Sequence, residues 1–505
     1  MKNMKLKTSL TTSFWKKIVI TALSVCMLTE PAMAKADTIV PYDSYNYDYW
    51  DNIVFTPAAY IPENSVSGTT LGVGSFLSPQ DLCVSPDGEV YIADTGNNRI
   101  VVVDNSLSQT VRVIDSFEHD GQTDTFKSPY GVCVSQNGQI YIADSENQRI
   151  VVLEEDDLSF VKIISNPTSD VLDDDFVFTP LKVTVDYADR VYCIARRMFQ
   201  GIMVFEGEGE FTGFFGTVKV NITPWEKLWR KLSTKEQRSR QLLFIPTEFT
   251  GIDIDADGFV YASNFDSNGE QAVRRLNPKG EDVIRKGENA NVGGDLVISG
   301  TSDYSGVSTI VDVVYRDKGI YSLLDSKRGR IFTYDHEGNL LYIFGGLGTQ
   351  AGTFTTPVAI EAIGDKIIVL DSNRKEMLVF TETQYGDLIN RAVGLRYDGD
   401  ETIAVDLWKQ VLMLDENNEL ANVGIGKAYL TAGDNVQAMK YLKIGMSRQY
   451  YSVAYRRYRN DFLKKYLGVI LTVVIGGVIL IVFLVKWRKK KKGIYVDDEG
   501  GAFDV

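Results

Sequence analysis

The chain has 505 residues, of which 44% are hydrophobic, 11% aromatic and 24% charged, and this composition excludes a disordered or collagen-like protein. Its formal charge of −14 at pH 7 argues against a nucleic-acid partner, because a net negative protein repels a polyanion. One hydrophobic core rarely extends over so many residues, so we expect more than one folded unit.

Residues 1–34 have the pattern of a secretory signal peptide. Five lysines precede an apolar run, and the small-x-small sequence Ala32-Met33-Ala34 follows it. The run is too short to span a bilayer, and its ending suits signal peptidase. A lipoprotein anchor at Cys26 is a less favoured alternative, because a bulky residue precedes this cysteine. We expect a linker over residues 35–57.

An internal repeat is the main feature of the central part. The sequence VYIADTGNNRIVVV at Val90–Val103 recurs as IYIADSENQRIVVL at Ile140–Leu153. In each unit, short apolar runs are separated by polar turns, among them Asp87-Gly88 and Asn137-Gly138 just before the two copies, which is typical of antiparallel strands. Four weaker copies follow, so we count six units over residues 58–383. Four short strands per unit predict the blades of a β-propeller.

The sixth unit lacks its own fourth strand, because the chain passes from Phe380 into helical sequence. The segment Tyr60–Gly68 stands before the first unit as an outer strand stands before each later unit. We predict that this N-terminal strand completes the sixth blade and removes an exposed sheet edge. The predicted fold class is therefore mainly β, a six-bladed propeller closed by an N-terminal strand.

These units resemble the NHL-repeat family, whose units run Pro-x-Gly-Val-Ala-Val-Asp and then Gly-x-Ile-Tyr-Val-Ala-Asp-Thr-x-Asn-x-Arg-Ile-x-Val. The first two units match this pattern closely and the other four match it loosely. The resemblance covers about residues 60–380, and it implies a six-bladed propeller with a role in protein interactions. WD40 repeats are disfavoured, because no unit contains a Trp-Asp pair.

Residues 384–465 change to helical spacing and resemble tetratricopeptide repeats (TPR). The resemblance implies a small α-helical module for protein interactions, of two repeats that lean on the propeller or on a further helix. That further helix, Gln449–Tyr466, is expected to continue into the membrane span. The residues that carry the resemblance are Ala404, Trp408, Gly426, Ala428, Tyr429, Ala438 and Leu442.

Residues 466–485 are uncharged and apolar, and as one helix they are long enough to cross about 30 Å of hydrocarbon. A basic cluster, Lys486–Lys492, follows the span, and such clusters stay on the cytoplasmic side. We expect a single-pass cell-membrane protein with an extracytoplasmic N-terminal part and a cytoplasmic tail at 486–505. Without the leader (five Lys, one Glu) and the tail (six basic, four acidic), the remaining chain has a formal charge of −20.

Two kinds of residue are candidates for ligand binding. The first kind forms Asp/Arg pairs in the polar turns of the repeats, although repeated pairs more often tie turns together. The second kind departs from the repeat, and basic groups of this kind suit a carboxylate or phosphate. The pairs in the turns are Asp94 with Arg99, Asp144 with Arg149, and Asp325 with Arg330. The residues that depart from the repeat are Arg196, Arg197 and Asn264.

A predicted helical insertion at 221–245 separates the third and fourth units. It begins with Thr223-Pro224-Trp225-Glu226, in which Thr is the N-cap, Pro fits the first turn and Glu completes the capping box. One face is basic and the other apolar, so contact with an anionic membrane or a partner helix is possible. Packing of the apolar stripe on the propeller is favoured. The stripe comprises Trp225, Leu228, Trp229 and Leu232.

Metal binding has weaker support. A calcium-loop pattern begins at Asp253, but its twelfth position is Asn264, and its Asp-Gly step suits a hairpin turn. With only His119 and His336 in the chain, a multi-histidine zinc site is disfavoured. No cofactor or metal site is predicted. A calcium-type ion in the channel stays open, with ligands drawn from Asp81, Glu248, Asn264 and Asp312.

Three cysteines follow the leader, Cys83, Cys133 and Cys193. Their odd number argues against a disulfide framework. All three lie in apolar, strand-like sequence, and we interpret them as small buried hydrophobic residues.

The sequence favours a membrane-anchored binding or scaffold protein with a protein partner in the membrane or envelope. A role as accessory subunit of a membrane transporter is a further interpretation. The alternative is a hydrolase or lyase of the lactonase type, with a divalent metal in the propeller channel. The enzyme alternative ranks second, because neither Gly-x-Ser-x-Gly nor His-Glu-x-x-His is present. No catalytic residue is predicted.

Overall fold

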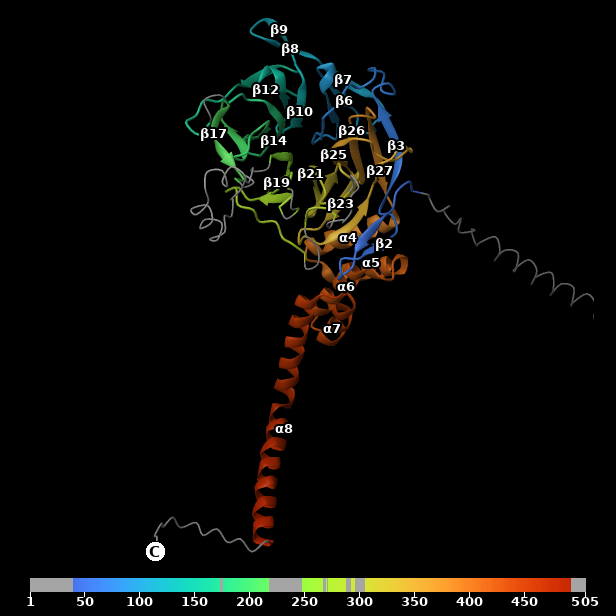
Figure 1. Ribbon diagram of the computed structural model, residues 1–505, viewed down its shortest axis with the longest axis vertical. Coiled ribbons are helices and arrows are strands. Elements are labelled where there is room, and N and C mark those ends of the chain that lie inside the picture. Colours follow the sequence, from blue (N-terminus) through green and yellow to red (C-terminus); the bar gives the residue numbers. More distant parts are fainter. Residues whose placement is uncertain are drawn as a thin grey trace, which may run out of the picture. The chain divides into compact units, whose positions relative to one another are not determined.

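The computed structural model describes residues 40–172, 176–217, 248–266, 269, 271–287, 292–295 and 305–491. Six antiparallel sheets are arranged around a common axis (Figure 1), which confirms the predicted six-bladed propeller. The predicted signal peptide at 1–34, the insertion at 221–245 with its stripe, and residues 492–505 of the predicted tail lie outside the described residues.

The first three blades have four strands each, in chain order from the channel outward. Blade one contains β4 (Asp81–Val84), β5 (Val90–Asp94), β6 (Arg99–Val103) and β7 (Thr110–Ile114). Blade two contains β10 (Pro129–Val134), β11 (Gln139–Asp144), β12 (Arg149–Glu154) and β13 (Phe160–Ile164). Blade three contains β14 (Pro180–Val185), β15 (Val191–Ala195), β16 (Ile202–Glu206) and β17 (Glu210–Phe215).

The other three blades differ from this pattern. Blade four shows three strands within the described ranges, β18 (Phe249–Ile254), β19 (Val260–Asn264) and β20 (Val273–Leu276). Blade five contains β21 (Ile310–Asp317), β22 (Ile320–Asp325), β23 (Arg330–Tyr334), β24 (Leu340–Phe344) and two N-terminal strands, β1 (Tyr45–Tyr47) and β2 (Ile53–Phe55). Blade six contains β25 (Pro357–Ile363), β26 (Lys366–Asp371), β27 (Glu376–Glu382) and β3 (Tyr60–Ser67).

The N-terminal part of the chain supplies strands to two blades. β3 is the outer strand of blade six and pairs with β27 from Tyr60↔Glu382 to Ser67↔Glu376. Part of the segment expected to be a linker is instead the β1–β2 hairpin, and Tyr45 of β1 pairs with Ile343 of β24. A second unexpected hairpin, β8 (Ser116–His119) with β9 (Gln122–Thr125), lies between blades one and two.

The repeat sequence explains the regular turns of the first two blades. Gly88 and Gly138 have φ of 85° and 76°, which suits a residue without a Cβ. The polar turns are short 3-10 helices, η1 (Thr95–Asn97) and η2 (Ser145–Asn147). Each helix ends at a left-handed residue, Asn98 or Gln148. Buried apolar side chains from adjacent blades pack together and form the core.

Five helices follow the propeller in the described chain: α4 (Gln384–Tyr397), α5 (Glu401–Leu414), α6 (Glu419–Thr431), α7 (Asn435–Ile444) and α8 (Arg448–Lys491). Thr383, Asn418 and Asp434 cap α4, α6 and α7 by accepting a backbone N–H. Six residues that carry the TPR resemblance are buried: Ala404, Trp408, Gly426, Ala428, Ala438 and Leu442. A Cβ on Gly426 would lie 2.6 Å from Leu442 Cγ, so these helices need glycine there to pack closely.

The last helix, α8, runs without a break from Arg448 to Lys491, as the sequence predicted (Figure 1). Within the described ranges, it is the one helix that is long and apolar enough to cross a membrane, and its most apolar window has a mean hydropathy of 3.1. The side chains of this window are exposed to the surroundings, as a lipid-facing segment requires.

Candidate functional site

Three charged side chains meet across the propeller channel, and we call Asp81, Lys182 and Asp312 the channel cluster. The Lys182 Nζ atom on β14 lies 2.8 Å from Asp81 Oδ1 on β4 and 3.0 Å from Asp312 Oδ1 on β21. All three side chains are at most 8% exposed. The cluster therefore ties the inner strands of blades one, three and five together.

Glycines in the intervening blades leave room for this cluster. Gly131 of blade two and Gly251 of blade four occupy the inner-strand positions that correspond to Asp81 and Asp312. A Cβ on Gly131 would lie 2.3 Å from the Leu181 carbonyl oxygen, and one on Gly251 would lie 2.4 Å from Asp312 Oδ1. Any larger residue at these two positions would displace the strands or the carboxylate.

A cavity of about 40 Å³ adjoins the channel cluster, and Asp253, Glu361, Cys83 and Cys133 also line it. Burial raises the pKa of Asp253 to about 7. Ligand pockets usually measure about 300–1,000 Å³, so this cavity admits little more than water. No group of His, Cys, Asp and Glu side chains in the described ranges is arranged to hold a metal ion.

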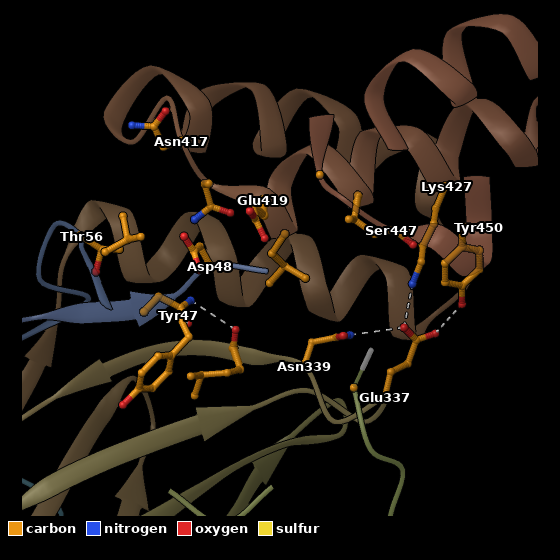
Figure 2. Close-up of a pocket in the computed structure, with 18 of the residues that line it drawn as sticks. Tyr47, Asp48, Thr56, Glu337, Asn339, Asn417, Glu419, Lys427, Ser447 and Tyr450 are labelled. Carbon is orange, nitrogen blue, oxygen red and sulfur yellow. Dashed lines mark hydrogen bonds and ion pairs between the residues drawn. The ribbon is translucent and has the colours of Figure 1, made fainter. Parts of the chain in front are cut away.

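A second charged cluster joins blade five to the helices, and we call Glu337, Lys427 and Arg396 the junction cluster. Glu337 lies in the β23–β24 turn, with its Oε2 atom 2.7 Å from Lys427 Nζ on α6. Its Oε1 atom pairs with Arg396 on α4 and accepts a hydrogen bond from Tyr450 Oη on α8 at 3.4 Å. Figure 2 shows Lys427 and Tyr450 converging on Glu337.

The protonation of the junction cluster follows from its composition of one anion and two cations. Burial favours the neutral form of Glu337, but the charges of Lys427 and Arg396 outweigh burial and lower the pKa of Glu337 to about 2. Burial, assisted by the like charge of Arg396, lowers the pKa of Lys427 despite its contact with Glu337. Glu337 is therefore the anion that holds two buried cations in place.

Glu337 and Lys427 of the junction cluster line a much larger pocket, of about 420 Å³, which we call the junction pocket. Three regions of the chain line this pocket: the β1–β2 hairpin, the edge of blades four and five, and the helices α6 and α8 with the loops before them. Figure 2 shows Asp48 and Thr56 of the hairpin region opposite Glu337 and Tyr450. The pocket therefore exists only where these regions meet.

Hydrogen bonds hold the hairpin in place. Asn46 Nδ2 donates to the Leu340 carbonyl oxygen of β24 at 3.4 Å, and the Tyr49 backbone N–H donates to Glu419 Oε1 of α6 at 3.5 Å. The Arg448 guanidinium also lies 5.6 Å from the centre of the Tyr49 ring. The hairpin thus contacts both the propeller and the helices.

Most of the residues that line the junction pocket are polar or charged. Among the described residues, the Thr56 hydroxyl is a buried group without a hydrogen-bond partner. The lining amides are those of Asn46, Asn339, Asn417, Asn418 and Gln449. The charged lining residues are Asp48, Arg285, Lys286, Glu337, Asp415, Glu419 and Lys427.

The comparison with protein families matches the NHL repeat at residues 76–103 and 126–153. These two segments include the first three strands of blades one and two. The chain contains NHL repeats. No curated protein matches the chain.

Solved structures of low sequence identity resemble the chain. Virginiamycin B lyase from Staphylococcus aureus is 12% identical, with 60% of this chain and 95% of that one covered, at a TM-score of 0.37. A Bacteroides thetaiotaomicron protein of unknown function is 14% identical, covering 66% and 79%, at 0.42. Hydrazine synthase from Kuenenia stuttgartiensis is 12% identical, covering 67% and 94%, at 0.36. Such values carry no information on the activity of this chain.

The predicted Asp/Arg pairs of the two NHL repeats bond within their own blades. Asp94 accepts from Arg99 Nε at 2.8 Å and from the Leu77 backbone N–H at 2.7 Å. Asp144 accepts from Arg149 Nε and from the Lys127 N–H at the same distances. Both carboxylates are fully buried, so each fastens its turn to the strand that enters the blade.

The third predicted pair differs from those of the NHL repeats. Asp325 accepts from the backbone N–H of Thr309 at 2.9 Å and lies 3.6 Å from Arg328. Arg330 instead donates to the carbonyl oxygens of Asp43 and Gly345. The sequence spacing alone therefore did not identify the partner of this arginine.

The predicted residues that depart from the NHL repeat do not gather at one site. Arg196 and Arg197 are exposed, whereas Asn264 is buried, and none of the three lines the junction pocket. Of the four channel candidates, Asp81 and Asp312 line the channel cavity, and Glu248 and Asn264 do not. The calcium-loop pattern forms a turn, in which Asp255 accepts from the backbone N–H of Asp257 and Phe259.

Sequence reasoning missed Lys182 and the whole junction cluster. A signal for Lys182 exists, because Lys182 stands at the glycine position of the Pro-x-Gly pattern of the NHL repeat. Glu337 lies in an ordinary Asp-x-x-Gly turn, and its partners belong to helices about 60 and 90 residues away in the chain. No local pattern marks such a contact.

Proposed function

We propose that this protein is a membrane-anchored, extracytoplasmic binding protein that recognises a polar peptide segment of a membrane or envelope protein in the junction pocket. The observation that carries this proposal is the pocket of about 420 Å³ between blade five and the helices. Its volume is within the usual range of ligand sites, about 300–1,000 Å³. It is also far larger than the channel cavity.

The chemistry of the lining favours a peptide. The side-chain amide of Asn417 both donates and accepts, so it can pair with the N–H and C=O groups of a peptide backbone. The Thr56 hydroxyl, without a partner among the described residues, gains a hydrogen bond from such a ligand. Lining residues of both charges allow acidic and basic side chains to be recognised along the peptide.

The junction cluster gives the pocket a preformed wall. Glu337, Lys427 and Arg396 fix the distance between blade five and the helices before any ligand arrives. A preformed site spends less binding free energy on ordering itself. The predicted TPR-like character of the helices, a family in which protein interaction is usual, supports the same class of ligand.

The length of α8 supports a pocket close to the membrane surface when its apolar part is the proposed anchor. Pocket residues Gln449 and Tyr450 lie in its first turn, and the apolar span begins near Tyr466. At 1.5 Å per residue, the pocket lies about 25 Å from the start of the span. A partner that projects a loop or terminus from the same membrane is within this reach.

Crosslinked co-purification of the full-length protein from native membranes tests the proposal. Asn417→Trp fills the exposed side of the pocket, and Asp257→Trp places the same side chain on an exposed turn of blade four. We expect one partner to be recovered with the wild type and with Asp257→Trp, and to be lost with Asn417→Trp. Equal recovery with both variants contradicts the proposal, as does metal-dependent turnover of lactones by the purified protein.

A further inference from the structure

An aromatic stripe runs along α8 before the apolar span. Its members, Tyr455, Tyr458, Phe462 and Tyr466, are three or four residues apart, so they share one face of the helix. The ring centroids of Tyr458 and Phe462 are 6.4 Å apart, and those of Phe462 and Tyr466 are 4.9 Å apart. Each side chain is 38–49% exposed.

The other side of this helical segment packs on α6 and α7. Ala454 is fully buried. Arg457 Nη1 donates to the Leu430 carbonyl oxygen at 3.0 Å, and Asn435 Nδ2 donates to Asp461 Oδ2 at 3.2 Å. At about 100° per residue, Arg457 and Asp461 share a face that lies more than 90° from the aromatic stripe. The stripe therefore points away from the neighbouring helices.

Basic residues occur in the same segment of the helix. Arg459 and Lys465 flank the aromatic stripe, whereas Arg456 and Lys464 lie on other faces. The Lys465 Nζ atom lies 5.2 Å from the centre of the Tyr466 ring. From Arg448 to Val485 the sequence has one acidic residue, Asp461, which bonds to Asn435 on the opposite face. This segment is therefore a positive region in a chain whose formal charge is negative.

The distance of the stripe from the span matches the depth of a lipid headgroup layer. Phe462 stands about 6 Å from Tyr466 along the helix and Arg456 about 15 Å, at 1.5 Å per residue. The headgroup region is about 5–7 Å thick on each side of the hydrocarbon. Beyond it, the surface potential of an anionic leaflet decays over about 10 Å at 0.1 M salt. Aromatic rings at this depth are typical of a membrane interface.

We infer that the segment of α8 from Arg456 to Tyr466 binds anionic phospholipid headgroups in the leaflet on the propeller side, an inference that rests on the proposed membrane anchor. The guanidinium and ammonium groups hold lipid phosphates, and the rings lie among the headgroups. Continuity with the span and complementary charge both favour lipid over protein. This contact fixes the depth of α8 and hence the height of the junction pocket above the membrane.

Site-specific photocrosslinking tests this inference in the full-length protein. Benzoylphenylalanine replaces Phe462, and the protein is placed in nanodiscs of equimolar phosphatidylglycerol and phosphatidylcholine. Mass spectrometry then identifies each adduct. We expect phosphatidylglycerol adducts to exceed phosphatidylcholine adducts by at least about fivefold, because one basic residue near an anionic surface contributes a factor of about five. The excess is expected to vanish when Arg456→Gln, Arg459→Gln, Lys464→Gln and Lys465→Gln are combined.

A matched control removes four exposed positive charges away from the stripe, and its lipid ratio is expected to equal that of the wild type. It combines Lys279→Gln, Lys409→Gln, Lys440→Gln and Lys443→Gln. Equal yields of the two lipids with the stripe intact overturn the inference, and so do adducts with protein, either a second copy or a partner helix. Extraction of the protein from native membranes by alkaline carbonate instead contradicts the membrane anchor itself, so the two failures are distinguishable.

Discussion

In the propeller channel a cation lies between two carboxylates, whereas at the junction a carboxylate lies between two cations. Burial disfavours the charge of Lys182, but Asp312 and Asp81 outweigh burial and raise its pKa, just as two cations lower the pKa of Glu337. In both clusters the central group keeps its charge. The channel cluster closes a cavity of about 40 Å³, while the junction cluster supports a pocket of about 420 Å³. A buried charge between two opposite charges therefore accompanies a small cavity in the channel and a large pocket at the junction.

Removing the central cation of the channel cluster is expected to have the largest effect. Lys182→Met leaves Asp81 and Asp312 buried without a positive partner, which typically costs about 3–5 kcal/mol of unfolding free energy. Denaturant unfolding of the full-length protein in detergent, monitored by a spectroscopic signal from the propeller, measures this loss. Lys182→Met combined with Asp81→Asn and Asp312→Asn removes all three charges and is expected to recover most of it. A full loss in the triple variant contradicts the electrostatic explanation.

Glu337→Gln tests the junction cluster and is expected to have a smaller effect. It leaves Lys427 and Arg396 without the anion that pairs with them, but the site borders an open pocket, so we expect a loss of about 2 kcal/mol. The loss is local, and hydrogen exchange in α6 should quicken while the inner strands of the propeller stay protected. Glu63→Gln breaks the exposed pair with Lys366 and serves as the control, with little change expected. Equally faster hydrogen exchange in the propeller and in the helices would contradict a local role for Glu337.

The two clusters are expected to respond to pH in opposite directions. Burial raises the pKa of Asp312 to about 6, although Lys182 opposes the shift. Because the folded state then holds a proton that the unfolded state releases, this group costs stability as the pH rises from about 4 to about 6. Asp312→Asn abolishes that cost, so the wild type should lose roughly 2 kcal/mol relative to the variant between pH 4 and 7. Parallel denaturant titrations of the two proteins at these pH values measure the difference.

The contribution of the junction cluster to stability changes with pH in the opposite direction. The pKa of Glu337 is lowered to about 2, so its contribution is present above the ordinary value near 4.5 and disappears as the pH falls toward 2. Hydrogen exchange in α6 at pH 3 and pH 6, with rates corrected for intrinsic pH dependence, should show the helix loosening in acid. An unchanged α6 at pH 3 is incompatible with a charged Glu337 as the link.

The smallest effect is expected at Tyr450. Tyr450→Phe removes a long hydrogen bond to Glu337, 3.4 Å, but keeps the ring that lies 3.9 Å from Lys427 Nζ. We expect a loss below about 1 kcal/mol, whereas Tyr450→Ala also loses the cation–π contact and should cost more. The α6 exchange rate distinguishes the two, and equal rates in both variants argue against a role for the ring.

The sequence was most informative where local patterns and long-range contacts coincide. The repeat at Val90–Val103 specified strands, turns and blade, because alternation and turn residues are local signals. The TPR resemblance likewise indicated Trp408, which is buried. The β1–β2 hairpin was missed, since its strands have three residues each and are stabilised by blade five rather than by their own pattern.

The candidate site was mostly beyond local sequence reasoning. Lys182 was detectable as a departure from the glycine of the NHL repeat, but its partners lie in blades one and five. Glu337, Lys427 and Tyr450 meet only because blade five and the helices pack together, and nothing near any of them in the sequence indicates this contact. The ligand-binding roles predicted for Arg196, Arg197 and Asn264 stay predictions, as do those of the Asp/Arg pairs.

The central claim, that the junction pocket holds a peptide of a neighbouring protein, is tested most directly by photocrosslinking in intact cells. Benzoylphenylalanine is placed at Asn417, which lines the pocket, or at Met413, which is 77% exposed on the preceding helix. The proposal predicts one discrete protein adduct from position 417, with the crosslink mapped to an extended segment of the partner, and none from position 413. No adduct at 417, or the same adduct in equal yield from both positions, would contradict it.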